Sequence, residues 1–174
     1  MSKTKHFKRD EAIGKIAENL VSRLMNGCGL ETTPVSDVDR KYWDLRVDVP
    51  KEWLFKDNHF TIEIKHDVYQ AKSGNIAIET WNSRKNEPAG IKMTKADLWA
   101  HVLSDSIWIA RTGDLRNFID YVKPIRIIEA AGDGNAFIYL YSSDEILESI
   151  FHRVDKMTVS DLKNKVKELC SVKY

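Results

Sequence analysis

The sequence has few of the residues that build cross-linked or low-complexity proteins. Its 174 residues include two cysteines, four prolines and eight glycines. These low counts exclude a disulfide scaffold, a collagen-like repeat and a low-complexity chain. Cys28 and Cys170 lie far apart and lack the spacing of a metal-binding pair. We therefore expect two free, packed thiols in a reducing, intracellular compartment such as the cytoplasm.

The sequence also lacks long apolar runs and an excess of charge of one sign. No apolar segment approaches the roughly 20 residues that cross a bilayer, so neither a membrane span nor a signal peptide is expected. The chain has 27 Lys and Arg residues, 26 Asp and Glu residues and a formal net charge of +1. This balance excludes a strongly basic coat protein, so any evidence for nucleic-acid binding must come from local clusters.

The remaining composition is that of a folded domain. Hydrophobic residues make up 43% of the chain, which is enough for one core in a protein of this length. We expect a single domain over 1–174, with a core over about 10–112 and a C-terminal hairpin and helices over about 113–174. Helical spacing of apolar residues and capping signals predict helices over 10–26, 96–103, 115–121, 144–154 and 160–170.

Short alternating or apolar segments lie between these helices. They predict strands over 43–48, 60–65, 75–81, 106–110, 125–130 and 136–141. The turn residues at 72–75 predict a hairpin between the second and third strands, and Gly132–Asn135 predicts one between the last two. Asp10 is expected to cap the first helix, and Thr94-Lys95-Ala96-Asp97 to begin the second as a capping box. The order of elements predicts a mixed α/β fold with one central sheet flanked by helices.

One constellation of residues points to chemistry. Asp44 opens a predicted strand, and Glu63-Ile64-Lys65 lies on the next strand. Carboxylates of this kind hold the hard divalent cations that phosphodiester hydrolysis requires. The spacing of Glu63 and Lys65 places both on one face of the strand, about 6.6–6.8 Å apart along it. An ammonium group at that distance can orient a water nucleophile and favour its deprotonation.

On these residues the sequence resembles the PD-(D/E)XK nuclease superfamily. The resemblance covers roughly 10–112 and includes Tyr42-Trp43-Asp44, with Trp43 where the family name has proline, Glu63-Ile64-Lys65, and Glu18 on the preceding helix. The stretch 90–97 is similar to segments of small phage-type nucleases of that superfamily. The resemblance implies a restriction-endonuclease-like αβββαβ core, metal binding by Glu18, Asp44 and Glu63, and a catalytic role for Lys65.

Several of these assignments have alternatives. Asp39 or Asp48 could replace Asp44 as the ligand, and Glu11 could replace Glu18. Glu79 shares a face with Glu63 and Lys65 if the predicted hairpin has the expected register, which makes it a further candidate metal ligand. A register slip of one residue would move Glu79 to the other face and leave it an ordinary strand charge.

Basic residues occur in two local clusters. Lys3, Lys5, Lys8 and Arg9 form the first, and Arg84, Lys85, Lys92 and Lys95 form the second. Thr94 and Lys95 lie where a helix N-terminus is expected, which makes the second cluster the stronger candidate for contacts with phosphate. We therefore expect Arg84, Lys85, Lys92, Thr94 and Lys95 to bind nucleic acid.

Together these features predict a Mg²⁺-dependent DNA endonuclease, with Mn²⁺ as a possible substitute. Two alternatives remain open: a Holliday-junction resolvase-type recombination nuclease, and a nucleic-acid-binding domain that keeps the fold without catalysis. A homodimer is expected because enzymes that cut two strands use two sites related by two-fold symmetry.

Overall fold

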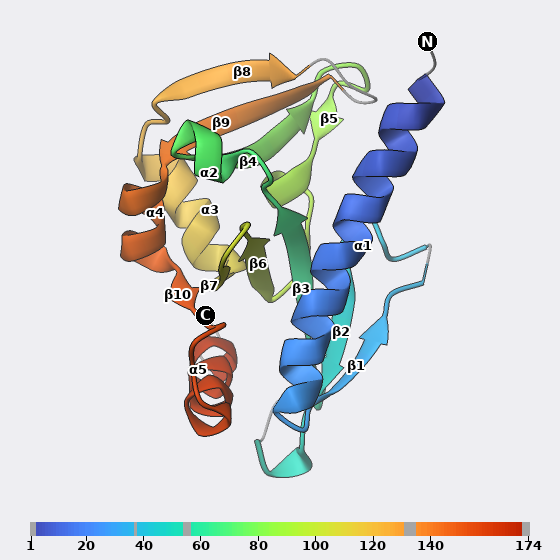
Figure 1. The fold of residues 1–174 in the computed structure, drawn as a ribbon, viewed down its shortest axis with the longest axis vertical. Coiled ribbons are helices and arrows are strands. Elements are labelled where there is room, and N and C mark those ends of the chain that lie inside the picture. The colour runs from blue at the N-terminus through green and yellow to red at the C-terminus, as the bar shows by residue number, and fades with distance from the viewer. Residues whose placement is uncertain (1–2, 37, 54–56, 131–134, 172–174) are drawn as a thin grey trace.

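The structure is a computed structural model that describes residues 3–36, 38–53, 57–130 and 135–171. For residues 3–10 it describes only the course of the first helix. The chain forms two sheets with helices packed around them (Figure 1). This arrangement confirms the mixed α/β fold class, although the β structure is divided between two sheets where one was expected.

The larger sheet, sheet A, lies at the centre of the molecule. Its strands, in spatial order, are β1 (Glu31–Pro34), β2 (Leu45–Asp48), β3 (His59–His66), β6 (Leu98–Val102), β7 (Ile107–Arg111) and β10 (His152–Arg153). All neighbouring pairs are antiparallel except β3 and β6, which are parallel. Sheet A is therefore a mixed sheet, and β3 lies inside it between β2 and β6.

The smaller sheet, sheet B, is antiparallel throughout. Its strands, in spatial order, are β5 (Glu87–Pro88), β4 (Asn75–Asn82), β9 (Ala136–Ser142) and β8 (Arg126–Ala130). The chain leaves sheet A after β3, forms β4 and β5 in sheet B, and returns to sheet A as β6. The predicted hairpin of β8 and β9 is confirmed.

Five α-helices and two 3-10 helices are present in the described residues. They are α1 (Lys3–Gly27), α2 (Gln70–Ser73), α3 (Thr112–Tyr121), α4 (Ser143–Ile150), α5 (Val159–Ser171), η1 (Lys51–Trp53) and η2 (Gly90–Lys92). Helix α1 runs along sheet A and contacts β1, β2 and β3 (Figure 1). Helix α3 contacts β6 and β7 of sheet A, and α4 contacts β4 and β9 of sheet B as well as β7. None of the helices in the described segments is long and apolar enough to span a membrane.

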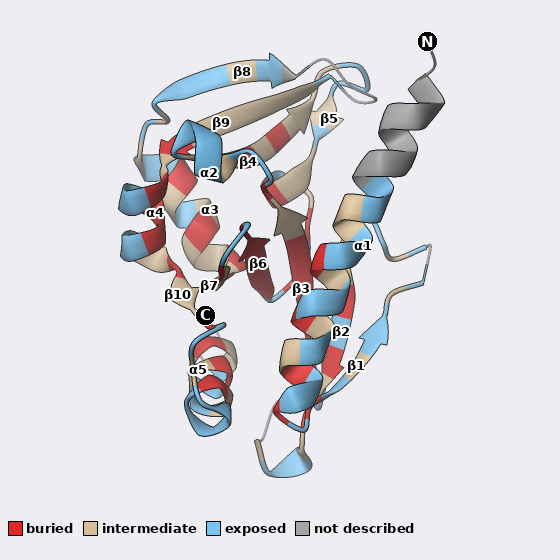
Figure 2. Cartoon of the chain, viewed as in Figure 1, coloured by how far each residue is buried: buried red, intermediate tan, exposed pale blue. Residues whose placement is uncertain are grey.

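Two hydrophobic cores meet at β6. Core A lies between sheet A and helices α1 and α5, and core B lies among sheet B, α3 and α4. Leu98 and Ala100 point into core A, whereas Trp99 points into core B. Every residue of β6 is buried, as the red central strands in Figure 2 show. The free thiols Cys28 and Cys170 both pack in core A, which confirms their expected packing role.

The helix predicted over 96–103 is wrong, because this segment is strand β6. A strand buried on both faces is apolar at consecutive positions, so it has no alternation to distinguish it from a short helix. Thr94 does not begin a helix, so the helix N-terminus that was expected to support a phosphate site is not formed there.

Three further predictions differ from the structure. The hairpin expected between 60–65 and 75–81 is wrong, because these strands, β3 and β4, belong to different sheets. Asp10 is not an N-cap, because α1 begins at Lys3, where good helix formers continue the helix beyond its apolar stripe. The helix expected over 144–154 ends at Ile150, and the chain then pairs with β7 as β10.

Candidate active site

Glu63 and Lys65 lie on one face of β3, as their spacing predicts. Ile62 and Ile64 point to the other face, into core A. The Lys65 Nζ lies 2.6 Å from Glu63 Oε1, and the Glu63 side chain is 9% exposed while that of Lys65 is 36% exposed. The Lys65 ammonium also lies 5.7 Å from the centre of the Trp99 ring. The pair is thus a nearly buried carboxylate beside a partly exposed cation.

Asp44 is fixed against the same strand by two backbone contacts. Its N–H donates to the Ile62 carbonyl at 2.9 Å, and its Oδ2 accepts from the Ile64 N–H at 2.7 Å. Burial and the neighbouring Glu63 charge raise the pKa of Asp44 from 3.8 to about 6, against the opposing effects of Lys65 and the Ile64 N–H. Asp44 is therefore an acid held close to a second acid.

Lys65 experiences the combined charge of several acids. Burial alone would lower the pKa of Lys65, but Glu63, Asp44 and, more weakly, Glu79 raise it above its ordinary value. The ammonium therefore stays charged throughout the physiological range. One lysine faces a group of carboxylates whose charge it cannot fully balance.

Glu18 faces this cluster from α1. It is half-buried, and its charge contributes to the raised pKa of Asp44. Glu11, the alternative on the same helix, is exposed and pairs with Lys15 at 3.2 Å. The helix acid that acts on Asp44 is therefore Glu18.

The two alternatives to Asp44 have other partners. Asp48 pairs with Arg46 at 2.8 Å, and Asp39 accepts a hydrogen bond from the Ser36 hydroxyl at 3.2 Å. Asp44 is among the main charges that raise the pKa of Lys65, whereas Asp39 and Asp48 are not.

Glu79 reaches the cluster from sheet B, although the hairpin that predicted its place does not form. The pairing of β4 with β9 shifts between Glu79 and Trp81, which marks a β-bulge at this point. Gly90 has a φ of +50°, and a Cβ there would lie 2.3 Å from the Glu79 carbonyl oxygen. Only glycine lets η2 pack this closely on the strand that carries Glu79.

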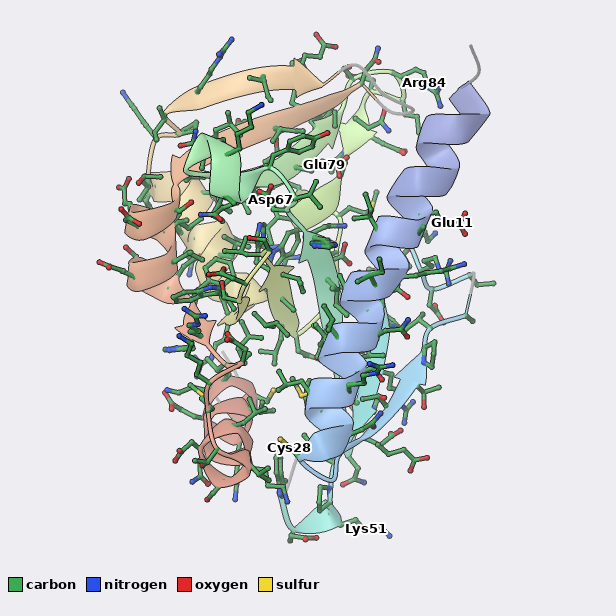
Figure 3. The ribbon with its side chains drawn as sticks, in the orientation of Figure 1. Glu11, Cys28, Lys51, Asp67, Glu79 and Arg84 are labelled. Carbon is green, nitrogen blue, oxygen red and sulfur yellow. The ribbon has the colours of Figure 1, made fainter. Side chains whose placement is uncertain are left out.

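Asp67 connects the two sheets just beyond Lys65, a role that no sequence pattern predicted. Its Oδ2 accepts from the Ala77 N–H of β4 at 3.1 Å, and its Oδ1 accepts from the N–H groups of Tyr69 and Gln70 at 3.0 Å. Although burial opposes this effect, His101 and these N–H groups lower the pKa of Asp67. Figure 3 shows Asp67 and Glu79 near the end of β3. Asp67 therefore helps to fix β4, and with it Glu79, against sheet A.

Thr94 occupies a different place from the one predicted. It is 3% exposed, and its hydroxyl lies 2.5 Å from the Tyr42 carbonyl and 3.2 Å from Glu63 Oε2. Arg116 of α3 donates to the carbonyls of Ile91 and Thr94 and so holds this segment. Thr94 thus lies behind Glu63, inside the protein. No local sequence signal distinguishes this place from a capping position.

The other predicted nucleic-acid contacts lie at the surface but not together. Arg84 is exposed on the loop between β4 and β5, far above the β3 end in Figure 3. Lys85 pairs with Glu87 at 3.3 Å, and Lys92 pairs with Asp120 at 2.5 Å. The side chains of the N-terminal cluster Lys3–Arg9 lie outside the described residues.

Lys95 follows Thr94, which contacts Glu63, and it has an aromatic partner. Its ammonium lies 4.0 Å from the centre of the Tyr42 ring, and its N–H donates to the Tyr42 carbonyl at 2.9 Å. Tyr42 is two residues before Asp44 in the chain. Lys95 is therefore a cation at the border of the candidate site.

The donor set suits a hard divalent cation. Magnesium is held through one or two carboxylates and keeps several waters. Asp44 and Glu63 supply two carboxylates. The Ile64 N–H donates to Oδ2 of Asp44, and this hydrogen bond does not occupy Oδ1. Within the described part of the chain, no three His, Cys, Asp or Glu side chains group closely enough to form a ready metal site. The type and number of these carboxylates therefore suit a magnesium ion that keeps several of its waters. They do not suit an ion coordinated by protein atoms alone.

Comparisons with known proteins give one structural likeness. No protein-family model matches the sequence, and no curated protein matches it. Among solved structures, the fold is similar to that of a bacterial homing endonuclease, I-Ssp6803I. The two chains are 17% identical, the match covers 90% of this chain and 95% of the other, and the TM-score is 0.46.

Proposed function

We propose that the protein is a metal-dependent DNA endonuclease that uses Mg²⁺, with Mn²⁺ as a substitute. The observation that carries the proposal is the half-buried Asp44 carboxyl close to the buried Glu63, with the pKa of Asp44 raised to about 6 and Lys65 in contact with Glu63. Crowded acids of this kind are unfavourable for the folded protein unless a cation offsets them, and perturbed acids cluster at functional sites.

Asp44 and Glu63 would hold the metal, with Glu18 and Glu79 as further acids around it. A bound divalent cation would stabilise the charge that develops on the phosphate and promote ionisation of water. The chain's own residues fix the geometry. The Ile64 N–H orients the Asp44 carboxylate, and Lys65 and the Thr94 hydroxyl contact the two oxygens of Glu63.

Lys65 would position the attacking water. Its ammonium is partly exposed, in contact with Glu63, and stays protonated because the surrounding acids raise its pKa. A permanent cation at this place lowers the cost of forming hydroxide beside it and stabilises negative charge in the transition state.

DNA is the proposed substrate, with Arg84, Lys85, Lys92 and Lys95 as contacts to its backbone. Phosphate contacts of this kind fix the register of the protein on the duplex. Cutting both strands would use two copies of the site, so a homodimer is part of the proposal.

The test is cleavage of a supercoiled plasmid by wild-type protein with Mg²⁺ and with a chelator. We expect cleavage only with the metal, and Lys65→Ala should reduce its rate by about 10²–10³-fold. Lys51→Ala is the matched control, because Lys51 is exposed on η1 at the opposite end of the molecule (Figure 3). Cleavage that survives chelation, or a Lys65→Ala rate equal to the Lys51→Ala rate, would contradict the proposal.

A further inference from the structure

Two lysines contact the same aromatic ring beside the acid cluster. The ammonium groups of Lys41 and Lys95 lie 4.7 Å and 4.0 Å from the centre of the Tyr42 ring. Both side chains are exposed, and Tyr42 is half-buried. Two cations gathered on one ring repel each other, and the face of a tyrosine offsets only part of that repulsion.

No acid among the described residues forms an ion pair with either ammonium. The ion pairs between described residues include Lys15, Lys65, Lys85, Lys92 and Lys165, but neither Lys41 nor Lys95. Hydrogen bonding and charge from Lys41, together with the charge of Lys95, lower the pKa of Tyr42. The hydroxyl therefore also experiences the two cations, and the group as a whole attracts an anion.

Short contacts fix this group relative to the acid cluster. The Tyr42 carbonyl accepts from the Lys95 N–H at 2.9 Å and lies 2.5 Å from the Thr94 hydroxyl, which is 3.2 Å from Glu63 Oε2. Asp44 follows Tyr42 by two residues. An anion bound at the lysines would therefore sit at a set position beside the two carboxylates.

We propose that Lys41, Tyr42 and Lys95 form a clamp for a single phosphate of the DNA backbone, next to the phosphate that is cleaved. The choice of DNA as ligand rests on the proposed function. Two ammonium groups and a phenol hydroxyl supply several donors to one phosphate, which is a stronger site than one surface lysine. The clamp would set the register of the strand relative to Asp44 and Glu63.

A single-phosphate clamp makes a quantitative prediction about salt. The logarithm of the DNA-binding constant falls with the logarithm of salt concentration, with a slope of about −0.9 for each phosphate neutralised. Removing both lysines should therefore reduce the magnitude of the slope by about 0.9. Two lysines on separate phosphates would reduce it by about 1.8.

The experiment measures fluorescence anisotropy of a labelled DNA duplex over a salt series, with a chelator present so that no metal is needed. The variants are Lys41→Ala, Lys95→Ala, the double variant, and Tyr42→Phe. The matched control is Lys51→Ala with Lys156→Ala, two exposed lysines whose removal changes the net charge equally. We expect the double variant to raise Kd about tenfold, with the control close to wild type.

Three results would overturn the clamp: a double-variant slope equal to that of the control, a slope change of about 1.8, or independent effects of the two lysines. A plasmid assay on the same proteins separates this proposal from the proposed function. If wild type binds DNA through the clamp but never cleaves with Mg²⁺, the endonuclease proposal fails, and only phosphate binding by Lys41, Tyr42 and Lys95 stands. If wild type cleaves and the double variant binds like the control, the clamp fails alone.

Discussion

Two groups of like charge lie on either side of Thr94, and they differ in burial. On one side lie two carboxylates, the half-buried Asp44 and the buried Glu63, with Lys65 in contact with Glu63. On the other side Lys41 and Lys95 place two exposed ammonium groups on the Tyr42 ring. Burial and the charge of Glu63 raise the pKa of Asp44 to about 6, whereas water and salt screen the repulsion between the two exposed ammonium groups.

This difference indicates two different ligands. Buried carboxylates need a compact cation that can replace water at close range, whereas exposed lysines suit an anion that arrives from solvent. A phosphodiester with its divalent cation would satisfy both groups at once. The following predictions test whether the two groups act separately, and whether Thr94 connects them.

The largest effect is expected from Asp44→Asn, which removes one charge from the buried group. Cleavage should fall about 10²–10³-fold, because a metal ligand and a fixed charge are lost. The exposed lysines are untouched, so DNA binding in a chelator should not weaken. Plasmid cleavage and anisotropy measure these two outcomes, and equal loss of both would contradict the separation of the two groups.

The same variant has an expected effect on stability, with a sign set by the pKa. Because the folded-state pKa of about 6 lies above the ordinary value of 3.8, the folded protein binds this proton more tightly than the unfolded chain does. Ionised Asp44 therefore costs stability above about pH 6, and the cost disappears below about pH 4. Urea unfolding should show Asp44→Asn more stable by about 1–3 kcal/mol near pH 8, and equal to wild type near pH 4.

A smaller effect is expected from Thr94→Val, which breaks the link between the groups. The variant keeps the shape but leaves the Ala96 N–H without the hydroxyl that it contacts at 3.2 Å. Unfolding free energy should fall by about 1–3 kcal/mol, and more Mg²⁺ should be needed for half-maximal cleavage. Thr94→Ser should restore both.

The control for the link is Thr80→Val. Thr80 is also buried, next to Glu79 in the chain, but its hydroxyl donates to the Phe137 carbonyl at 3.2 Å, whereas that of Thr94 contacts Glu63. We expect Thr80→Val to lower the free energy of unfolding without changing the Mg²⁺ concentration needed for half-maximal cleavage. If Thr94→Val and Thr80→Val change the Mg²⁺ requirement equally, Thr94 has no specific role.

The smallest effect is expected when Ca²⁺ replaces the chelator in the DNA-binding assay. The cation should tighten wild-type binding several-fold, because it offsets the carboxylates that repel phosphate. The Lys41→Ala, Lys95→Ala double variant should bind less tightly but keep this ratio, whereas Asp44→Asn should lose it. Weaker binding with Ca²⁺ would count against a metal site at the carboxylates.

The site on β3 could be predicted from the sequence because the two faces of β3 differ in polarity. Ile62 and Ile64 alternate with Glu63 and Lys65, so both the strand and the shared face of the acid and lysine could be predicted. Strand β6 could not be predicted in this way. Its residues pack into core A on one face and core B on the other, which leaves an apolar run with no period.

The sequence by itself determined the mixed α/β fold class, the shared face of Glu63 and Lys65, the free cysteines and the balance of charge. Only the tertiary structure decided which distant groups surround that face. Thr94 is buried behind Glu63 because the segment before β6 returns beside Tyr42, and the charge of Glu79 acts on Lys65 from a second sheet that Asp67 helps to hold. These arrangements depend on how the two sheets pack, and the spacing of residues along the chain does not predict that packing.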